Sequence, residues 1–331
     1  MRDVAALAGV SLKTVSRVVN DEPGVKPDTV ERVREAARKL EYQHNLTASS
    51  LRRRDGRTNI VGLLLEDIAN PFSSSIYRAV EDTARERGVS VLAGSLEEIP
   101  AREVELTAEL FQRRIDGLII APSSRDHSYL QKEQRQGTAM VFIDRPPVLL
   151  AADTVLSDAT EGVLSGIRQL LELGHKRIGY LGDAGYIVTA HDRVTAYQAA
   201  IKVAGLPHDP ALVQLDVSTI ESAHAATLAL LDLAEPPTAL FTGQNLITIG
   251  AVRALRERNL QHDVALIGFD DFLLADLLEP AVTVVAQDPS AVGSEAARLL
   301  FARIDGAEGD YEHIVVPTRL IRRGSGEIKA R

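Results

Sequence analysis

Apolar residues at helical spacing open the chain and predict two short helices joined by a tight turn. Gly9 gives this turn its backbone freedom, and Ser11 is placed to cap the second helix through its side-chain oxygen. The residues that we expect to face inward are Val4, Ala5, Leu7 and Ala8 in the first helix and Val15, Val18 and Val19 in the second.

A third helix is predicted from Pro27, a residue that suits the first helical position. Its apolar face is formed by Val30, Val33, Ala37 and Leu40, so three helices can together close a very small core. The second helix then presents an outward face of Leu12, Lys13, Ser16 and Arg17. Arginine can donate two hydrogen bonds to guanine in the major groove, although a solvated helix face has the same composition.

From residue 59 onward, apolar runs alternate with amphipathic stretches, which is typical of parallel sheets buried on both faces. Four runs form a first group at residues 60–65, 89–93, 117–121 and 139–143. The pattern then restarts at residues 177–181, 239–242 and 264–268, and a further run covers residues 282–285. We therefore expect an α/β body of two similar lobes, with a ligand in the crevice at the carboxyl ends of the strands.

Polar residues follow these strands, where they could bind a ligand or cap the next helix. Carboxylates and amides suit the vicinal hydroxyls of a sugar or nucleoside, and Phe72, Phe269 or a tyrosine would cover its apolar face because the chain has no tryptophan. The strand-end residues are Asp67, Asn70, Phe72, Asp144, Arg145, Gln244, Asn245, Asp270, Asp271 and Gln287.

Charge is distributed unevenly along the 331 residues, whose net charge is -9. Residues 1–57 carry +4 and the remainder carries -13, so a basic head precedes an acidic body. Clustered basic residues favour contact with a polyanion, although a window of this size can drift by as much through chance.

Several functional classes lack support in the sequence. With no cysteine, no signal-peptide core at the amino terminus and no apolar run of membrane-spanning length, we expect a cytoplasmic protein that does not enter a membrane. No glycine-rich phosphate loop follows a predicted strand, and the eight histidines have no metal-binding spacing. We therefore expect neither an enzyme nor a cofactor or metal site.

Residues 3–20 (DVAALAGVSLKTVSRVVN) resemble the DNA-binding headpiece of the lactose and galactose repressor family, and their spacing is highly specific. The resemblance implies base contacts from Leu12, Lys13 and Arg17. It places Ser11, Thr14, Ser16 and Asn20 nearer the DNA backbone. Family members usually carry several residues before this motif, including a threonine that caps the first helix. Either such residues precede Met1 or this headpiece binds DNA more weakly.

The segment that follows, residues 42–54, resembles the family hinge. The resemblance implies a short helix that forms when two copies meet in the minor groove, with Leu51 inserted between base pairs and Asn45 also at the DNA. A flexible linker with an incidental leucine is the alternative.

The resemblance continues through LGHKRI at residues 173–178 and GFDD at residues 268–271, so it covers essentially the whole chain. It implies an effector-binding body similar to periplasmic sugar-binding proteins. The implied effector contacts are Asn70, Phe72, Asp144, Arg145, Arg193, Asp270 and Gln287. Gln244 takes the place of the usual asparagine of an Asn-Asp pair, and Asp158-Ala159-Thr160 replaces a usual Asp-Asn-Glu, which leaves the identity of the effector open.

The patterns and the resemblance together define the expected domains. A helix-turn-helix domain covers residues 1–43 and a hinge residues 44–57. One lobe takes residues 58–158 and 288–318, and the other residues 159–287 and 319–331. The end of the chain has no heptad repeat, so we expect a homodimer that binds a near-palindromic DNA duplex.

Three hypotheses follow. The first is a DNA-binding transcriptional regulator, expected to be a repressor, in which a small sugar-like effector between two lobes controls operator affinity. The second is a sugar-binding transport protein, which lacks an export signal and gives residues 1–60 no purpose. The third is a nucleotide-dependent enzyme, which turnover of a sugar or nucleotide by the pure protein would support.

Overall fold

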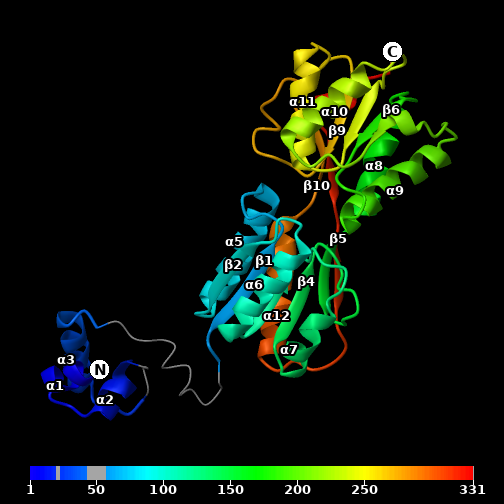
Figure 1. Cartoon of the computed structure of the whole chain (residues 1–331). Coiled ribbons are helices and arrows are strands. Elements are labelled where there is room, and N and C mark those ends of the chain that lie inside the picture. The colour runs from blue at the N-terminus through cyan, green and yellow to red at the C-terminus, as the bar shows by residue number, and fades with distance from the viewer. Residues whose placement is uncertain (20–22, 43–56, 331) are drawn as a thin grey trace. The chain divides into compact units, whose positions relative to one another are not determined.

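The computed structural model describes residues 1–19, 23–42 and 57–330, and it divides the chain into two compact units, residues 1–59 and 60–331 (Figure 1). The described residues of the smaller unit form three helices, α1 (Arg2–Ala8), α2 (Leu12–Val19) and α3 (Pro27–Lys39). They enclose a core of Val4, Ala5, Ala8, Val15, Val18, Val33 and Ala36. The three predicted helices are therefore confirmed.

The turn between α1 and α2 forms as its residues suggest. Gly9 ends α1 in the left-handed conformation, with φ 62°, which a side chain would disfavour. Ser11 Oγ accepts a hydrogen bond from the Thr14 N–H at 3.1 Å, which confirms the predicted cap of α2. Leu7 was expected inside, but it is 54% exposed because Val4 and Ala8 already fill the inward side of a helix of only seven residues.

The larger unit contains two six-stranded sheets. The first has the order β11-β5-β4-β3-β1-β2 and the second the order β12-β10-β9-β8-β6-β7. The strands of the first sheet are β1 (Ile60–Leu65), β2 (Ser90–Ser95), β3 (Gly117–Ile120), β4 (Ala139–Ile143), β5 (Asp153–Ser157) and β11 (His313–Val316). Those of the second are β6 (Ile178–Leu181), β7 (Val213–Gln214), β8 (Ala239–Thr242), β9 (Ala265–Phe269), β10 (Thr283–Ala286) and β12 (Arg319–Ile321).

Helices cover both faces of each sheet (Figure 1). Around the first sheet lie α5 (Pro71–Glu86), α6 (Pro100–Gln112), η1 (Ser128–Leu130), α7 (Gln131–Arg135) and α12 (Pro289–Ile304). Around the second lie α8 (Ala159–Glu172), α9 (Val188–Val203), η2 (Pro210–Leu212), α10 (Ile220–Leu231), α11 (Asn245–Glu257) and η3 (Gly324–Glu327). Burial on both faces explains why most of the strands are continuous apolar runs.

The order of the strands requires the chain to pass between the two sheets three times: after β5, after β10 and between β11 and β12. All pairs in both sheets are parallel except β10 with β12, which is antiparallel. The carboxyl ends of β1 and β4 therefore meet at one edge of the first sheet, and those of β6 and β9 at one edge of the second.

Candidate effector pocket and DNA-binding helix

Helix α2 exposes the side chains that the sequence assigned to base contacts. Leu12 is 46% exposed, and Lys13 and Arg17 are also exposed, whereas Val15 and Val18 are buried in the headpiece core. Lys13 and Arg17 are one helical turn apart and therefore lie on the same face. This face can enter a major groove and donate hydrogen bonds to base edges.

The other predicted DNA-binding residues differ in their surroundings. Ser11 and Thr14 bond to each other, with 2.9 Å between their hydroxyl oxygens, so Ser11 has a structural role in the cap as well. Ser16 is half-buried on α2. Asn20, Asn45 and Leu51 lie outside the described residues.

All eight residues predicted to bind an effector line one pocket of the larger unit: Asn70, Phe72, Asp144, Arg145, Arg193, Gln244, Asp270 and Gln287. They come from loops and helix starts that follow strands of both sheets, and from α9. The pocket is therefore a crevice between the two lobes, and it brings together residues up to 217 positions apart in the sequence.

Asp144 and Asp270 occupy equivalent positions in the two lobes. Each follows a central strand and has a left-handed backbone, with φ 64° for Asp144 and φ 67° for Asp270. The Asp144 N–H donates to Val155 O at 3.2 Å, and the Asp270 N–H donates to Val285 O at 2.9 Å. Aspartate tolerates this conformation better than most residues, which allows a sharp turn at the end of each strand.

Arg145 is 9% exposed and forms a bidentate ion pair with Glu98, in which Nη1 donates to Oε2 at 2.7 Å. Its Nη1 also donates to Pro122 O at 3.0 Å, and its Nε lies 3.4 Å from Asp144 Oδ2. Burial alone would lower the pKa of Arg145, but its hydrogen bonds to Glu98 and the charge of Asp144 raise the pKa above its ordinary value. The guanidinium therefore stays charged and balanced by carboxylates.

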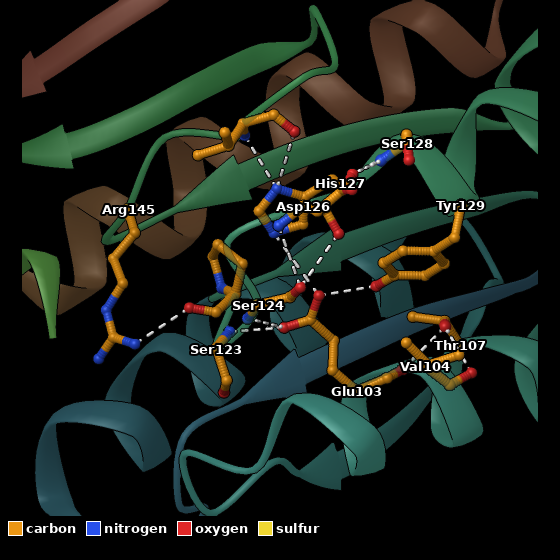
Figure 2. A network of polar contacts seen from close by, with 12 residues as sticks. Glu103, Val104, Thr107, Ser123, Ser124, Asp126, His127, Ser128, Tyr129 and Arg145 are labelled. Carbon is orange, nitrogen blue, oxygen red and sulfur yellow. Dashed lines mark hydrogen bonds and ion pairs between the residues drawn. The ribbon is translucent and has the colours of Figure 1, made fainter. Parts of the chain in front are cut away.

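Behind Arg145, a buried polar network fixes the loop that carries Pro122 (Figure 2). The carboxylate of Glu103, which is fully buried, accepts hydrogen bonds from Ser124 N at 2.8 Å, from Ser123 N and from Tyr129 Oη at 2.7 Å. His127 Nδ1 accepts from the Val148 N–H at 2.8 Å, and burial lowers the pKa of this histidine. Uncharged donors thus bind the Glu103 carboxylate and keep in place the loop that contacts Arg145 at the wall of the pocket.

Arg193 lies on the opposite wall, 8% exposed, and donates from Nη1 to Gly243 O at 2.9 Å. Its guanidinium lies 4.1 Å from the centre of the Phe269 ring. Phe269 is fully buried, so the expectation that it could cover a ligand is wrong, whereas Phe72 lines the pocket. The ring of Phe269 instead supports the arginine.

Among the described residues, two side-chain hydrogen bonds join the lobes across the crevice. Asn245 Nδ2 donates to Asn70 Oδ1 at 3.0 Å, and Arg125 Nη2 donates to Tyr186 O at 2.6 Å. Asn70 Oδ1 also accepts from the Phe72 N–H at 3.0 Å, so this residue caps α5 while it faces the pocket. Asn70 therefore caps a helix, as one of the two alternatives predicted, and it also lines the pocket.

The pocket contains acidic residues that the sequence did not single out: Glu66, Glu98 and Asp183. Glu66 directly follows β1 and Asp183 closely follows β6, so the strand-end pattern could have identified both. Glu98 lies in the loop after β2 and has no such signal.

Burial changes the acidity of several of these groups. It raises the pKa of Glu66 to about 7, with a further contribution from the charge of Glu98, while Arg145 opposes the change. Burial also raises the pKa of Asp183, although hydrogen bonds from Ala184 and Gln244 lower it in part. It raises the pKa of Asp270 as well, and there the charge of Arg193 opposes the increase.

The raised pKa of Glu66 predicts that Glu66→Gln changes the stability of the protein in a pH-dependent way. The groups that act on Glu66 are the acids Glu98, Asp144 and Asp183 and the base Arg145. Protonated Glu66 favours the folded state below pH 4.5, and that contribution is lost as the pH rises through about 7. Glutamine cannot ionise, so thermal melts of the variant should show a gain in stability at about pH 8 and little change at about pH 4.5. Glu172→Gln, on the exposed side of α8, is the control, and a gain that does not vary with pH would contradict the assignment.

Comparisons with known proteins agree with this architecture. Residues 1–45 match the model of bacterial regulatory proteins of the lacI family, and residues 167–326 match that of a periplasmic binding protein-like domain. The chain is 31% identical to the HTH-type transcriptional regulator DegA of Bacillus subtilis (strain 168), over 98% of this chain and 96% of DegA. It is also 31% identical to the HTH-type transcriptional repressor CytR of Escherichia coli (strain K12), over 98% and 95% of the two chains.

Solved structures match the whole fold. A complex of the transcriptional regulator CelR with cellobiose has 31% identity and a TM-score of 0.71, over 98% of both chains. The lac repressor dimer bound to operator has a TM-score of 0.86 over 98% of both chains, and its 24% identity supports the fold alone. The exposed headpiece helix and the two-lobed pocket, together with relatives of 31% identity over nearly the whole chain, identify a DNA-binding transcriptional regulator. The chain belongs to the lacI family of bacterial regulatory proteins.

Within the described residues, no helix combines the length and apolar character that a membrane crossing requires. None of the acidic and histidine side chains there gathers into a group that could hold a metal ion.

Proposed function

We propose that this chain is a transcriptional repressor that binds a near-palindromic operator as a homodimer and changes its operator affinity when a sugar-like effector enters the pocket. The observation that supports this best is the meeting of eight residues, chosen for ligand chemistry, in one crevice between two lobes. Differential affinity of the effector for the closed and open lobes would couple its binding to DNA binding.

Relatives support the class of effector and of partner. A CelR structure contains cellobiose, and a lac repressor structure contains a dimer on its operator. Arg193, Asp270 and Gln287 would bind hydroxyl groups of the effector, and Phe72 would pack against its apolar face. A repressor of this kind acts on DNA in the cytoplasm.

We propose the same domain limits as above. Residues 1–43 form the DNA-binding domain, residues 44–57 the hinge, residues 58–158 and 288–318 one lobe, and residues 159–287 and 319–331 the other. These limits agree with the division of the strands, since β5 and β11 belong to the first sheet and β10 and β12 to the second.

The experiment selects duplexes from a random double-stranded library with the full chain and then measures their release by sugars. A near-palindromic consensus with a steep salt dependence is expected. Recovery of no consensus, or binding as a monomer, would overturn the proposal.

Asp270→Asn tests the pocket. The Asp270 carboxylate lines the crevice and accepts a hydrogen bond from Gln287 Nε2 at 2.6 Å. The variant loses a hydrogen bond between a charged group and the effector, so calorimetry should show effector binding that is about 10- to 100-fold weaker. The neighbouring Asp271→Asn is the matched control, because Asp271 pairs with Arg323 instead. Equal affinity in the two variants would place the effector elsewhere.

A further inference from the structure

The pocket has an unbalanced set of charges. Five carboxylates line it, but only two arginines do among the described residues: Glu66, Glu98, Asp144, Asp183 and Asp270 against Arg145 and Arg193. Both lobes contribute carboxylates, since the first three come from loops after strands of the first sheet and the other two from loops after strands of the second. An anion that enters therefore meets an excess of negative charge in a partly buried site, where charge interactions are stronger than in water.

Both arginines already have partners on the protein. Arg145 already pairs with Glu98 through two hydrogen bonds and lies beside Asp144. Arg193 donates to Gly243 O and rests on the Phe269 ring, and its charge acts on Asp183 and Asp270. The positive charges are thus used to hold the walls of the pocket.

Glu66 differs from the other four acids. In the part of the chain that the structure describes, Glu98 and Asp144 lie beside Arg145, Asp183 accepts from Gln244, and Asp270 accepts from Gln287. The Glu66 carboxylate has no such hydrogen bond there, although it is only partly exposed and lines the crevice. A partly buried carboxylate without a donor is best satisfied by a donor on the ligand.

A second and independent feature points to a ligand in the same place. Arg193 is 8% exposed and lines the pocket, yet its Nε has no hydrogen-bond partner within the described residues. A ligand that satisfies both walls must accept a hydrogen bond at Arg193 and donate one at Glu66. A hydroxyl group can do both, a protonated amine can do the second, and a phosphate or carboxylate can do only the first.

We propose that the pocket selects effectors by charge: it accepts sugars with hydroxyl or protonated amine groups and rejects sugar phosphates and sugar acids, and Glu66 is the residue that sets this selection. The proposal rests on the proposed function and deepens it, since it concerns the effector class of the same pocket. The fold provides the other carboxylates with partners, so removal of the Glu66 charge should change selectivity without emptying the site.

The test uses the full chain and matched sets of common hexoses and pentoses, each as the free sugar, the 2-amino-2-deoxy sugar, the 6- or 5-phosphate and the corresponding acid. Thermal shift identifies binders, because a ligand that binds the folded state raises the melting temperature, and calorimetry measures their affinities. We expect the free or amino form to bind about 10- to 100-fold more tightly than its phosphate or acid. The reason is that the negative charge of the phosphate or acid is repelled by the carboxylates of the partly buried pocket.

At about pH 8, where the Glu66 carboxyl is ionised, Glu66→Gln should reduce this preference by about 10-fold while the free sugar still binds, because glutamine keeps the size of the side chain and loses its charge. Glu97→Gln is the control, since Glu97 is exposed, pairs with Arg102 and lies outside the pocket. Operator selection with the same preparations separates this proposal from the proposed function. With operator binding intact, tighter binding of a phosphate or acid than of its parent sugar, an unchanged preference in Glu66→Gln, or no response to any member of the panel would each overturn the proposal.

Discussion

Arg17→Ala is expected to weaken operator binding by about 10- to 100-fold for each half-site, because one bidentate contact with guanine contributes about 1–3 kcal/mol. Arg17 is exposed on α2 while Val15 and Val18 hold the helix in its core, so the loss should come without unfolding. Fluorescence anisotropy with the selected duplex, across a range of salt concentrations, measures the effect. Since the proposed homodimer presents two copies of α2, the two losses should multiply.

Lys39→Ala is the control for that experiment, because Lys39 is exposed near the end of α3 and pairs with Glu35. A role for Arg17 at a phosphate predicts a different result: weaker binding to all sequences and a salt slope reduced by about 1. A variant with the affinity and specificity of the parent chain would exclude a DNA contact of either kind.

Arg303→Ala is expected to lower the free energy of unfolding of the larger unit by about 3–5 kcal/mol, because it leaves a buried carboxylate without its counter-ion. Asp153, at the start of β5, is fully buried and bonds to Arg303 Nε at 2.8 Å and Nη2 at 2.9 Å. Arg303 also donates to Asp310 O at 2.7 Å, so it ties the end of α12 to the segment before β11. Denaturant unfolding followed by circular dichroism measures the loss.

Arg298→Ala is the matched control on the same helix. Arg298 pairs with Glu295 and Glu312, but its side chain is 50% exposed, so the expected loss is about 0–1 kcal/mol. Equal losses in the two variants would contradict the view that the buried pair anchors this part of the first lobe.

The central strands could be predicted because burial on both faces leaves a continuous apolar run in the sequence. The predicted runs at residues 60–65 and 139–143 coincide with β1 and β4. The missed strands are short or mixed in polarity, and β7, β11 and β12 lie at sheet edges. In β11, for example, His313 and Val315 are exposed, so the local pattern does not distinguish this strand from a loop.

The candidate site was predictable in part for a similar reason. Parallel strands bring their carboxyl ends to one edge, so polar residues such as Asp144 and Asp270 could be identified without coordinates. Glu98 could not, because its place in the pocket depends on how a loop folds back to pair with Arg145. The same holds for Phe269, whose residue type suits a ligand but whose ring is buried beneath Arg193.

The sequence by itself determined the class of this protein. Helix periodicity, Gly9 and Ser11 define a headpiece whose polar face carries Arg17, and the apolar runs define a two-lobed α/β body. These are local patterns, which short-range sterics and burial impose on neighbouring residues. The tertiary structure alone decided the charge of the pocket and the partners of each acid, because those depend on side chains that only the packing of two lobes brings within hydrogen-bonding distance.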